Sequence, residues 1–398
     1  MDEKRTPDDL FSGEEFVDQD NDLYGDVEVS SGEHIVVYSR DWTVETIYNQ
    51  IRQGNIELNP KFQRRNAWKE DKRSRLVESF VLGLPVPEIV LAEDPKKPKS
   101  FIVIDGKQRL LTIAGFIQPD EYDYWDKAVL HGLNSRRDLN GVSYRDLQTD
   151  PARSDDHRYF LNADMRCTVI SGFDKNDVLY DIFYRLNTGS ESLSTQELRQ
   201  VLHRGPFADF LFEITQTSGP IHDVLGLDEP DPRLYDMEFI LRFISFRLFG
   251  DRYSGNLKRF LDDSMGEIND RWKTLQTEVE REIEHLNRAA RKLKSVFDIS
   301  QIGRRFRDGQ YLGRVNKVLL EAQLFFFGEL SVDDITPESN RAFVENYQLL
   351  FQDLEFIDTI SGSTKDVARY RTRCEKLKKT FEAAYDVTID KDLLTGNP

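Results

Sequence analysis

The stretch Phe101–Ile113, FIVIDGKQRLLTI, decides how the first half of this chain folds. Its four leading apolar residues are typical of a buried strand, and the residues after Gly106 are spaced as in a helix. A strand that turns into a helix at a glycine directs free backbone N–H groups to one point, where the helix dipole favours an anion. Lys107 and Arg109 add two cations there, and Asp105 adds one carboxylate. The pattern therefore predicts a site for a phosphate group, alone or with a metal ion.

The segments around this turn predict a small α/β unit. Taken alone, the turn also fits a second interpretation, a plain tight turn with solvated cations, because turn glycines are common. Thr43 is a candidate N-cap, and the alternation of Met165, Cys167 and Val169 with polar residues predicts a half-buried strand. The other expected elements are strands over 34–38, 88–91 and 101–104 and helices over 43–53 and 70–82.

The composition fits a folded protein of two or three domains. The chain has 398 residues, of which 39% are hydrophobic, including 26 Phe and 15 Tyr. It has no apolar run of the ~20 residues that a membrane helix needs, and it begins without the apolar segment of a signal peptide. Its two cysteines, Cys167 and Cys374, are far apart and no Cys/His cluster occurs, so neither zinc nor a disulfide framework is expected. We expect a cytoplasmic protein with no membrane partner.

Charge is unevenly distributed along the chain, whose net charge is −17. Residues 1–35 contain 12 Asp and Glu but 2 Lys and Arg, and residues 1–33 are expected to form a disordered acidic tail. Residues 61–109 contain 12 Lys and Arg against 7 Asp and Glu. The acidic total argues against a protein that coats nucleic acid non-specifically. The local basic site fits a polyanion of limited size, such as a nucleotide or a short stretch of nucleic acid.

The rest of the chain is expected to be mostly helical. Apolar residues recur at helical spacing in segments near 206–216, 235–249, 256–264, 268–296, 311–328, 338–357 and 365–384. The predicted fold class is therefore α+β, with a small mixed α/β domain over 34–205 followed by a helical domain over 206–398.

Several motifs occur in the order found in a known family. They are the Phe62–Trp68 loop, GLPVP at 83–87, DGKQR at 105–109, FYRLN at 183–187 and LSTQELR at 193–199. Together they resemble the N-terminal domain of GmrSD-type modification-dependent restriction systems and of phosphorothioate-sensing defence proteins. That family belongs to the ParB/sulfiredoxin-like superfamily, so the resemblance implies a ParB-like fold for the α/β domain.

Two departures from this family bear on function. The family motif is usually D-G-Q-Q-R, and Lys107 replaces its first glutamine, which keeps an anion site. Many relatives carry a C-terminal HNH nuclease domain, but His222 and His285 are the only histidines after residue 210. A nuclease of that type is therefore expected to be absent or supplied by a partner chain. Sulfiredoxin activity is not expected either, because the phosphate turn has no cysteine.

The resemblance implies nucleotide binding, with hydrolysis in some members. Asp105, Gln108 and Arg109 are the expected catalytic residues, and Asp105 would also hold Mg²⁺ or orient a water. Arg109 would grip phosphate oxygens. The expected nucleotide-binding residues are Gly106, Lys107, Thr112, Gln63, Arg64, Arg65, Asn187 and Arg199.

Structural roles are the alternatives for several residues near the expected site. They are a salt bridge for Arg64, packing for Phe62 and Trp68, a helix end for Asn187, a capping box with Ser194 for Glu197, and pairing with Glu197 for Arg199.

The leading hypothesis is a bacterial defence protein that binds and hydrolyses a nucleoside triphosphate and thereby regulates action on foreign or modified DNA. One alternative is a metal-dependent DNA nickase or nuclease, in which Asp105 and Glu197 hold one metal ion. Another is a non-enzymatic nucleotide or DNA sensor that acts through a partner. The base of the nucleotide, a nuclease partner chain and self-association are left open by the sequence.

Overall fold

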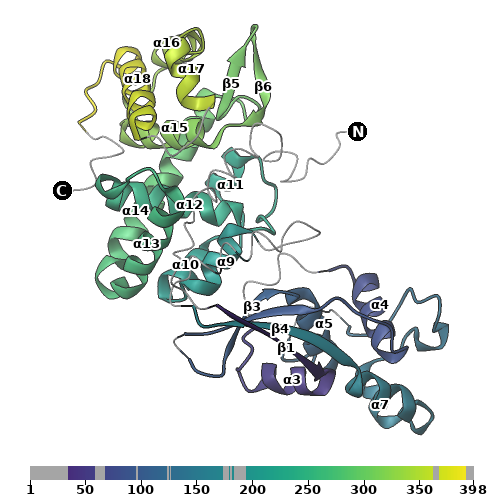
Figure 1. Ribbon diagram of the computed structural model, residues 1–398. Helices are drawn as coiled ribbons and strands as arrows, with labels where there is room; N and C mark the ends of the chain where they lie inside the picture. Colours follow the sequence, from purple (N-terminus) through teal and green to yellow (C-terminus); the bar gives the residue numbers. More distant parts are fainter. Residues whose placement is uncertain are drawn as a thin grey trace. The chain divides into compact units, whose positions relative to one another are not determined.

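The structure is a computed structural model that describes residues 35–58, 68–95, 97–122, 125, 127–173, 179, 182, 194–361 and 367–390. These residues form two compact units, the first ending at Val201 and the second beginning at Leu202. Figure 1 follows the first unit from purple to teal and the second from teal to yellow. The expected acidic tail over 1–33 lies outside the described residues.

The first unit is built around a four-stranded mixed sheet (Figure 1). The two edge strands pair antiparallel with their neighbours, whereas the two central strands are parallel to each other. All four predicted strands are confirmed, although the first is longer than expected. In sheet order they are β1 (Val36–Thr43), β4 (Asp164–Ser171), β2 (Ile89–Glu93) and β3 (Phe101–Asp105).

Helices cover this sheet and share its hydrophobic core. Alternate strand residues, among them Leu91, Val103 and Val169, belong to one buried cluster with residues of the helices. Thr43 caps the first helix as predicted, because its Oγ1 accepts a hydrogen bond from Thr46 N at 3.1 Å. The helices of this unit are α3 (Val44–Arg52), α4 (Glu70–Val81), α5 (Lys107–Ile117), α6 (Tyr144–Thr149), α7 (Ser154–Asn162) and α9 (Thr195–Leu202), the last ending where the second unit begins.

The second unit is mostly helical and includes one two-stranded sheet of β5 (Arg304–Arg307) and β6 (Gln310–Val315). Together with the mixed sheet of the first unit, this confirms the α+β fold class. None of the helices described has both the length and the apolar composition required to cross a membrane. The helices of this unit are α10 (Pro206–Ile214), α11 (Pro220–Leu225), α12 (Tyr235–Phe249), α13 (Leu257–Asp270), α14 (Trp272–Val296), α15 (Lys317–Glu329), α16 (Pro337–Leu350), α17 (Leu354–Ser361) and α18 (Val367–Tyr385).

Three of the expected helices are wrong in their extent. The helix expected over 256–264 is longer than predicted, because α13 continues to Asp270. The expected helix over 311–328 begins too early, because its first residues belong to β6 and Asn316 caps α15 by accepting from Leu319 N at 3.1 Å. The expected helix over 338–357 is divided into α16 and α17. The division lies at Asp353, whose Oδ1 accepts from Glu355 N at 2.9 Å and so begins a new helix.

Candidate functional site

The centre of the candidate site is the turn from β3 into α5, which the sequence predicted. Gly106 has φ +92° and begins the helix, and its carbonyl accepts from Arg109 N at 3.0 Å and Leu110 N at 3.1 Å. A β-carbon at this position would lie 2.4 Å from Cγ2 of Ile89 on β2. Glycine is therefore required both by the left-handed backbone and by the close approach of β2.

Arg109 and Asp105 form an ion pair across this turn. Nη2 of Arg109 lies 2.8 Å from Oδ2 of Asp105 and also donates to the carbonyl of Glu88 at 2.9 Å. The arginine side chain is 12% exposed and the aspartate side chain 46% exposed, so the carboxylate is the more accessible partner. Nε of Arg109 is buried and has no hydrogen-bond partner within the described part of the chain. Two of the three expected catalytic side chains, those of Asp105 and Arg109, are thus oriented before any ligand arrives.

Gln108 connects the turn to the end of the Phe62–Trp68 loop. Its Oε1 accepts from the backbone N of Trp68 at 3.1 Å, and the ammonium of Lys72 lies 4.4 Å from the centre of the Trp68 ring. Trp68 and the glycine turn therefore meet at Gln108. The remaining expected loop and helix-end residues, Phe62, Gln63, Arg64, Arg65 and Asn187, lie outside the described residues.

Lys107 is the first residue of α5 and is half-buried. Burial lowers the pKa of its ammonium group, and the carboxylate of Glu197 acts in the opposite direction. No carboxylate within the described ranges lies close enough to form an ion pair with it. A cation at the positive end of a helix is unfavourable, so two physical effects disfavour the charge of Lys107 in the absence of an anion.

Glu197 and Arg199 are buried on α9. Glu197 Oε2 accepts from Ser194 N at 2.6 Å and Ser194 Oγ accepts from Glu197 N at 3.1 Å, which confirms the predicted capping box. Nη1 of Arg199 donates to Oε1 of Gln196 at 2.6 Å. Thr112 is also buried, and its hydroxyl donates to the carbonyl of Gln108 at 2.8 Å. Nucleotide contacts by Thr112 and Arg199 remain predictions.

The expected Mg²⁺ would depend on a small number of protein oxygens. Within the described residues, no group of three or more His, Cys, Asp and Glu side chains is arranged to hold a metal ion. At the turn, Asp105 offers one half-exposed carboxylate. Mg²⁺ is commonly held by one or two carboxylates and by phosphate oxygens of a substrate, and that donor set fits Asp105.

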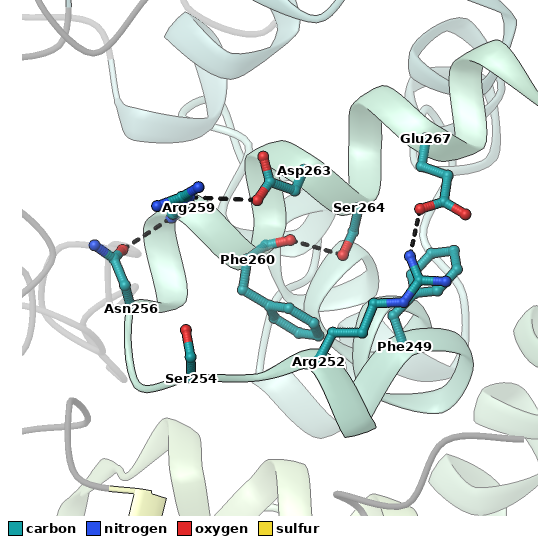
Figure 2. Close-up of a pocket in the computed structure, with 9 residues that line it drawn as sticks. All are labelled: Phe249, Arg252, Ser254, Asn256, Arg259, Phe260, Asp263, Ser264 and Glu267. Carbon is teal, nitrogen blue, oxygen red and sulfur yellow. Dashed lines mark hydrogen bonds and ion pairs between the residues drawn. The ribbon is translucent and has the colours of Figure 1, made fainter.

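A separate pocket in the second unit differs from the turn in its charge. It has a volume of about 370 Å³ and lies along one side of α13. Figure 2 shows that Arg252 points to Glu267 and Arg259 to Asp263, and both pairs are ion pairs. Because its positive and negative groups balance, this pocket lacks the excess positive charge that binding of a phosphate chain requires.

The sequence analysis missed two contributors to the site. The carbonyl of Glu88 is an acceptor for Arg109, and the side chain of Ile89 packs under Gly106. Neither has a signature in the sequence, because one is a backbone atom and the other an ordinary strand residue. Both are brought to the turn by the pairing of β2 with β3.

Comparison with known proteins finds a family similar to most of the first unit. A family model described as GmrSD restriction endonuclease, N-terminal domain, matches residues 44–204. No curated protein and no solved structure gives a match. The matched range contains the Gly106 turn, its Asp105–Arg109 pair and the Ser194–Glu197 capping box. Residues 44–204 of this chain are therefore similar to the N-terminal domain of GmrSD restriction endonucleases.

Proposed function

We propose that residues 44–204 bind the phosphates of a nucleoside triphosphate at the start of α5 and hydrolyse the nucleotide. In this proposal, the cycle regulates restriction-type bacterial defence against foreign or modified DNA. The name of the matching family supports the second part, because it describes restriction endonucleases. The first part rests on the chemistry of the turn.

The observation that carries the proposal is the position of Lys107. Its half-buried ammonium group stands at the positive end of a helix, and burial lowers its pKa. A bound phosphate would compensate both the desolvation of the ammonium and the helix dipole. An anion is therefore the ligand class that this position favours most.

The neighbouring residues have complementary roles in this proposal. The backbone N–H groups that follow Gly106 cradle a phosphate, and Gln108 positions the backbone of Trp68. Arg109 presents its guanidinium group in the orientation set by Asp105. Asp105 contributes one carboxylate to Mg²⁺, which when bound would neutralise phosphate charge.

The test is nucleotide binding and phosphate release by the full chain with ATP, GTP, CTP and UTP, with and without Mg²⁺. Lys107→Met removes the charge and keeps most of the side chain. Lys97→Met is the matched control, because Lys97 is an exposed lysine of the same unit, on the turn between β2 and β3. A charge-assisted hydrogen bond contributes about 1.5–3 kcal/mol, so Lys107→Met should weaken binding roughly 10- to 100-fold.

The outcomes separate the competing functions. Phosphate release that is lost in Asp105→Ala and Arg109→Ala supports hydrolysis at the turn. Tight binding without phosphate release would favour a sensor that acts through a partner. Equal affinities of Lys107→Met and Lys97→Met would overturn the phosphate site itself.

A further inference from the structure

The β5–β6 hairpin is the feature of the second unit that the proposed nucleotide site leaves unexplained. Its sequence over 304–314, RRFRDGQYLGR, contains four arginines and one acidic residue, on a chain whose net charge is −17. The two strands pair with each other and with no other strand among the described residues. The hairpin is therefore rich in arginine on an acidic protein. Arg304 is buried, Arg305 donates to the carbonyl of Ile360, and Arg307 is exposed.

The base of the hairpin is held firmly by the surrounding helical unit. The guanidinium group of Arg304 is buried and donates to the carbonyls of Ile299 and Ile302. Tyr311 packs against Phe297, with ring centres 6.3 Å apart, and its hydroxyl accepts from Gln348 of α16 at 3.3 Å. A two-stranded ribbon is marginally stable by itself, so these contacts fix its orientation within the unit. Figure 1 shows it extending as a separate ribbon beside α16 and α17.

The tip of the hairpin is polar and exposed. Asp308 and Gly309 have φ values of +51° and +80°, as in the tight turn that matches the twist of a hairpin. Arg307 and Gln310 are partners in the strand register, so their side chains lie on the same face. Arg307 is 77% exposed and Asp308 82% exposed, with Nε and Oδ2 3.4 Å apart. An ion pair this exposed holds its partners weakly.

We propose that this tip enters the major groove of duplex DNA, with Arg307, Asp308 and Gln310 facing the base edges. The major groove is wide enough for a two-stranded ribbon. Arginine pairs with guanine, glutamine with adenine, and aspartate accepts from cytosine, so all three side chains have base-reading chemistry. Arg307 also gives the tip an exposed positive charge, which is attracted to the phosphates that border the groove.

Duplex DNA fits better than a single strand because the aromatic residues of the hairpin are already packed. Single strands are bound chiefly by stacking of bases on aromatic rings. The rings of Phe306 and Tyr311 lie 5.0 Å apart and pack against each other. The inference rests on the proposed action on DNA, and it is independent of nucleotide hydrolysis at the Gly106 turn.

The test is binding of the full chain to a pool of labelled random-sequence duplex DNA, measured by fluorescence anisotropy at several salt concentrations. Arg307→Ala should weaken binding about 10-fold and relax the preference for guanine in the DNA selected from the pool. Arg158→Ala is the matched control, because Arg158 is 66% exposed and also pairs with an aspartate, Asp155, at 3.0 Å. The control should change affinity less than about twofold.

Gln310→Ala provides a second, charge-neutral variant. It should leave the salt dependence unchanged and relax the sequence preference of the DNA selected from the pool. Failure of the unaltered protein to bind duplex DNA, or equal losses in Arg307→Ala and Arg158→Ala, would overturn the proposal. Preference for single strands would overturn it too. Phosphate release without DNA is measured in parallel and should be unchanged in Arg307→Ala. A failure of the DNA-binding proposal is therefore distinct from a failure of the proposed nucleotide site.

Discussion

Replacing Gly106 with alanine tests the construction of the candidate site directly. The substitution places a β-carbon on a residue with φ +92°, which costs about 1–2 kcal/mol for an L-residue. The same β-carbon would lie 2.4 Å from Cγ2 of Ile89, so β2 or the turn must move. Overpacking of this kind costs about 1–3 kcal/mol. We therefore expect Gly106→Ala to lower the free energy of unfolding of the first unit by about 2–5 kcal/mol.

Gly141 offers a matched control for the backbone contribution. It belongs to the same unit and has φ +84°, but a β-carbon there would have no atom within 4 Å. Gly141→Ala therefore carries the cost of the left-handed backbone without the collision, about 1–2 kcal/mol. The difference between the two variants isolates the contact with Ile89.

Urea unfolding followed by tryptophan fluorescence measures this difference in the intact chain. Three of the four tryptophans, Trp42, Trp68 and Trp125, lie in the first unit, so the signal reports mainly on that unit. The double variant that combines Gly106→Ala with Ile89→Ala should lose less unfolding free energy than the sum of the losses in the two single variants. Ile89→Ala removes the methyl group with which the new β-carbon collides. Equal destabilisation by Gly106→Ala and Gly141→Ala, with no coupling to Ile89, would refute this account of the turn.

Three further predictions concern single side chains. Asn269→Ala should lower the free energy of unfolding of the second unit by about 2–3 kcal/mol in urea, because Oδ1 accepts from the backbone N of Phe207 at 3.0 Å at the start of α10. Burial and the nearby Asp236 raise the pKa of Asp231 from 3.8 to about 6, so the ionised carboxylate destabilises the folded protein above about pH 6 and this cost disappears toward pH 4. Asp231→Asn should remove about 2 kcal/mol of that pH dependence, measured as the difference in unfolding free energy from the unaltered protein between pH 4.5 and 7.5. Gln108→Ala should weaken nucleotide binding without changing the unfolding free energy by more than about 1.5 kcal/mol, because it releases one hydrogen bond to the Trp68 backbone; unchanged binding in calorimetry would remove Gln108 from the site.

The parts of the site that could be predicted from sequence are those determined locally. The strand, the glycine and the helix of Phe101–Ile113 follow one another in the chain, and each has its own pattern. The Ser194–Glu197 capping box is also a local pattern. By contrast, the contacts of Arg109 with Glu88 and of Gln108 with Trp68 join residues 21 and 40 positions apart. Strand pairing and packing determine such contacts. In each of the two contacts one partner is a backbone atom, which any residue type would supply.

The hairpin at 304–315 shows that a local signal can also be obscured by its neighbours. Asp308-Gly309 is a strong hairpin pattern. The residues after it run into the apolar helix α15, and Tyr311 and Leu312 fit the helical spacing of that helix. Periodicity alone therefore extended the helix backward across β6. Asn316, which caps α15, marks the true boundary.

Removing the charge of Lys107 should change nucleotide binding and protein stability in opposite directions. Its folded-state pKa is lowered by burial, so at neutral pH the charged ammonium destabilises the ligand-free protein. Lys107→Gln, which introduces the residue usual in the resembling family motif, removes that charge. It should raise the free energy of unfolding of the ligand-free first unit and weaken nucleotide binding. Structural lysines behave differently, because their removal lowers stability. Urea unfolding with and without nucleotide distinguishes a lysine that binds an anion from a structural lysine. A loss of stability in ligand-free Lys107→Gln would contradict the assignment of an anion site at the start of α5.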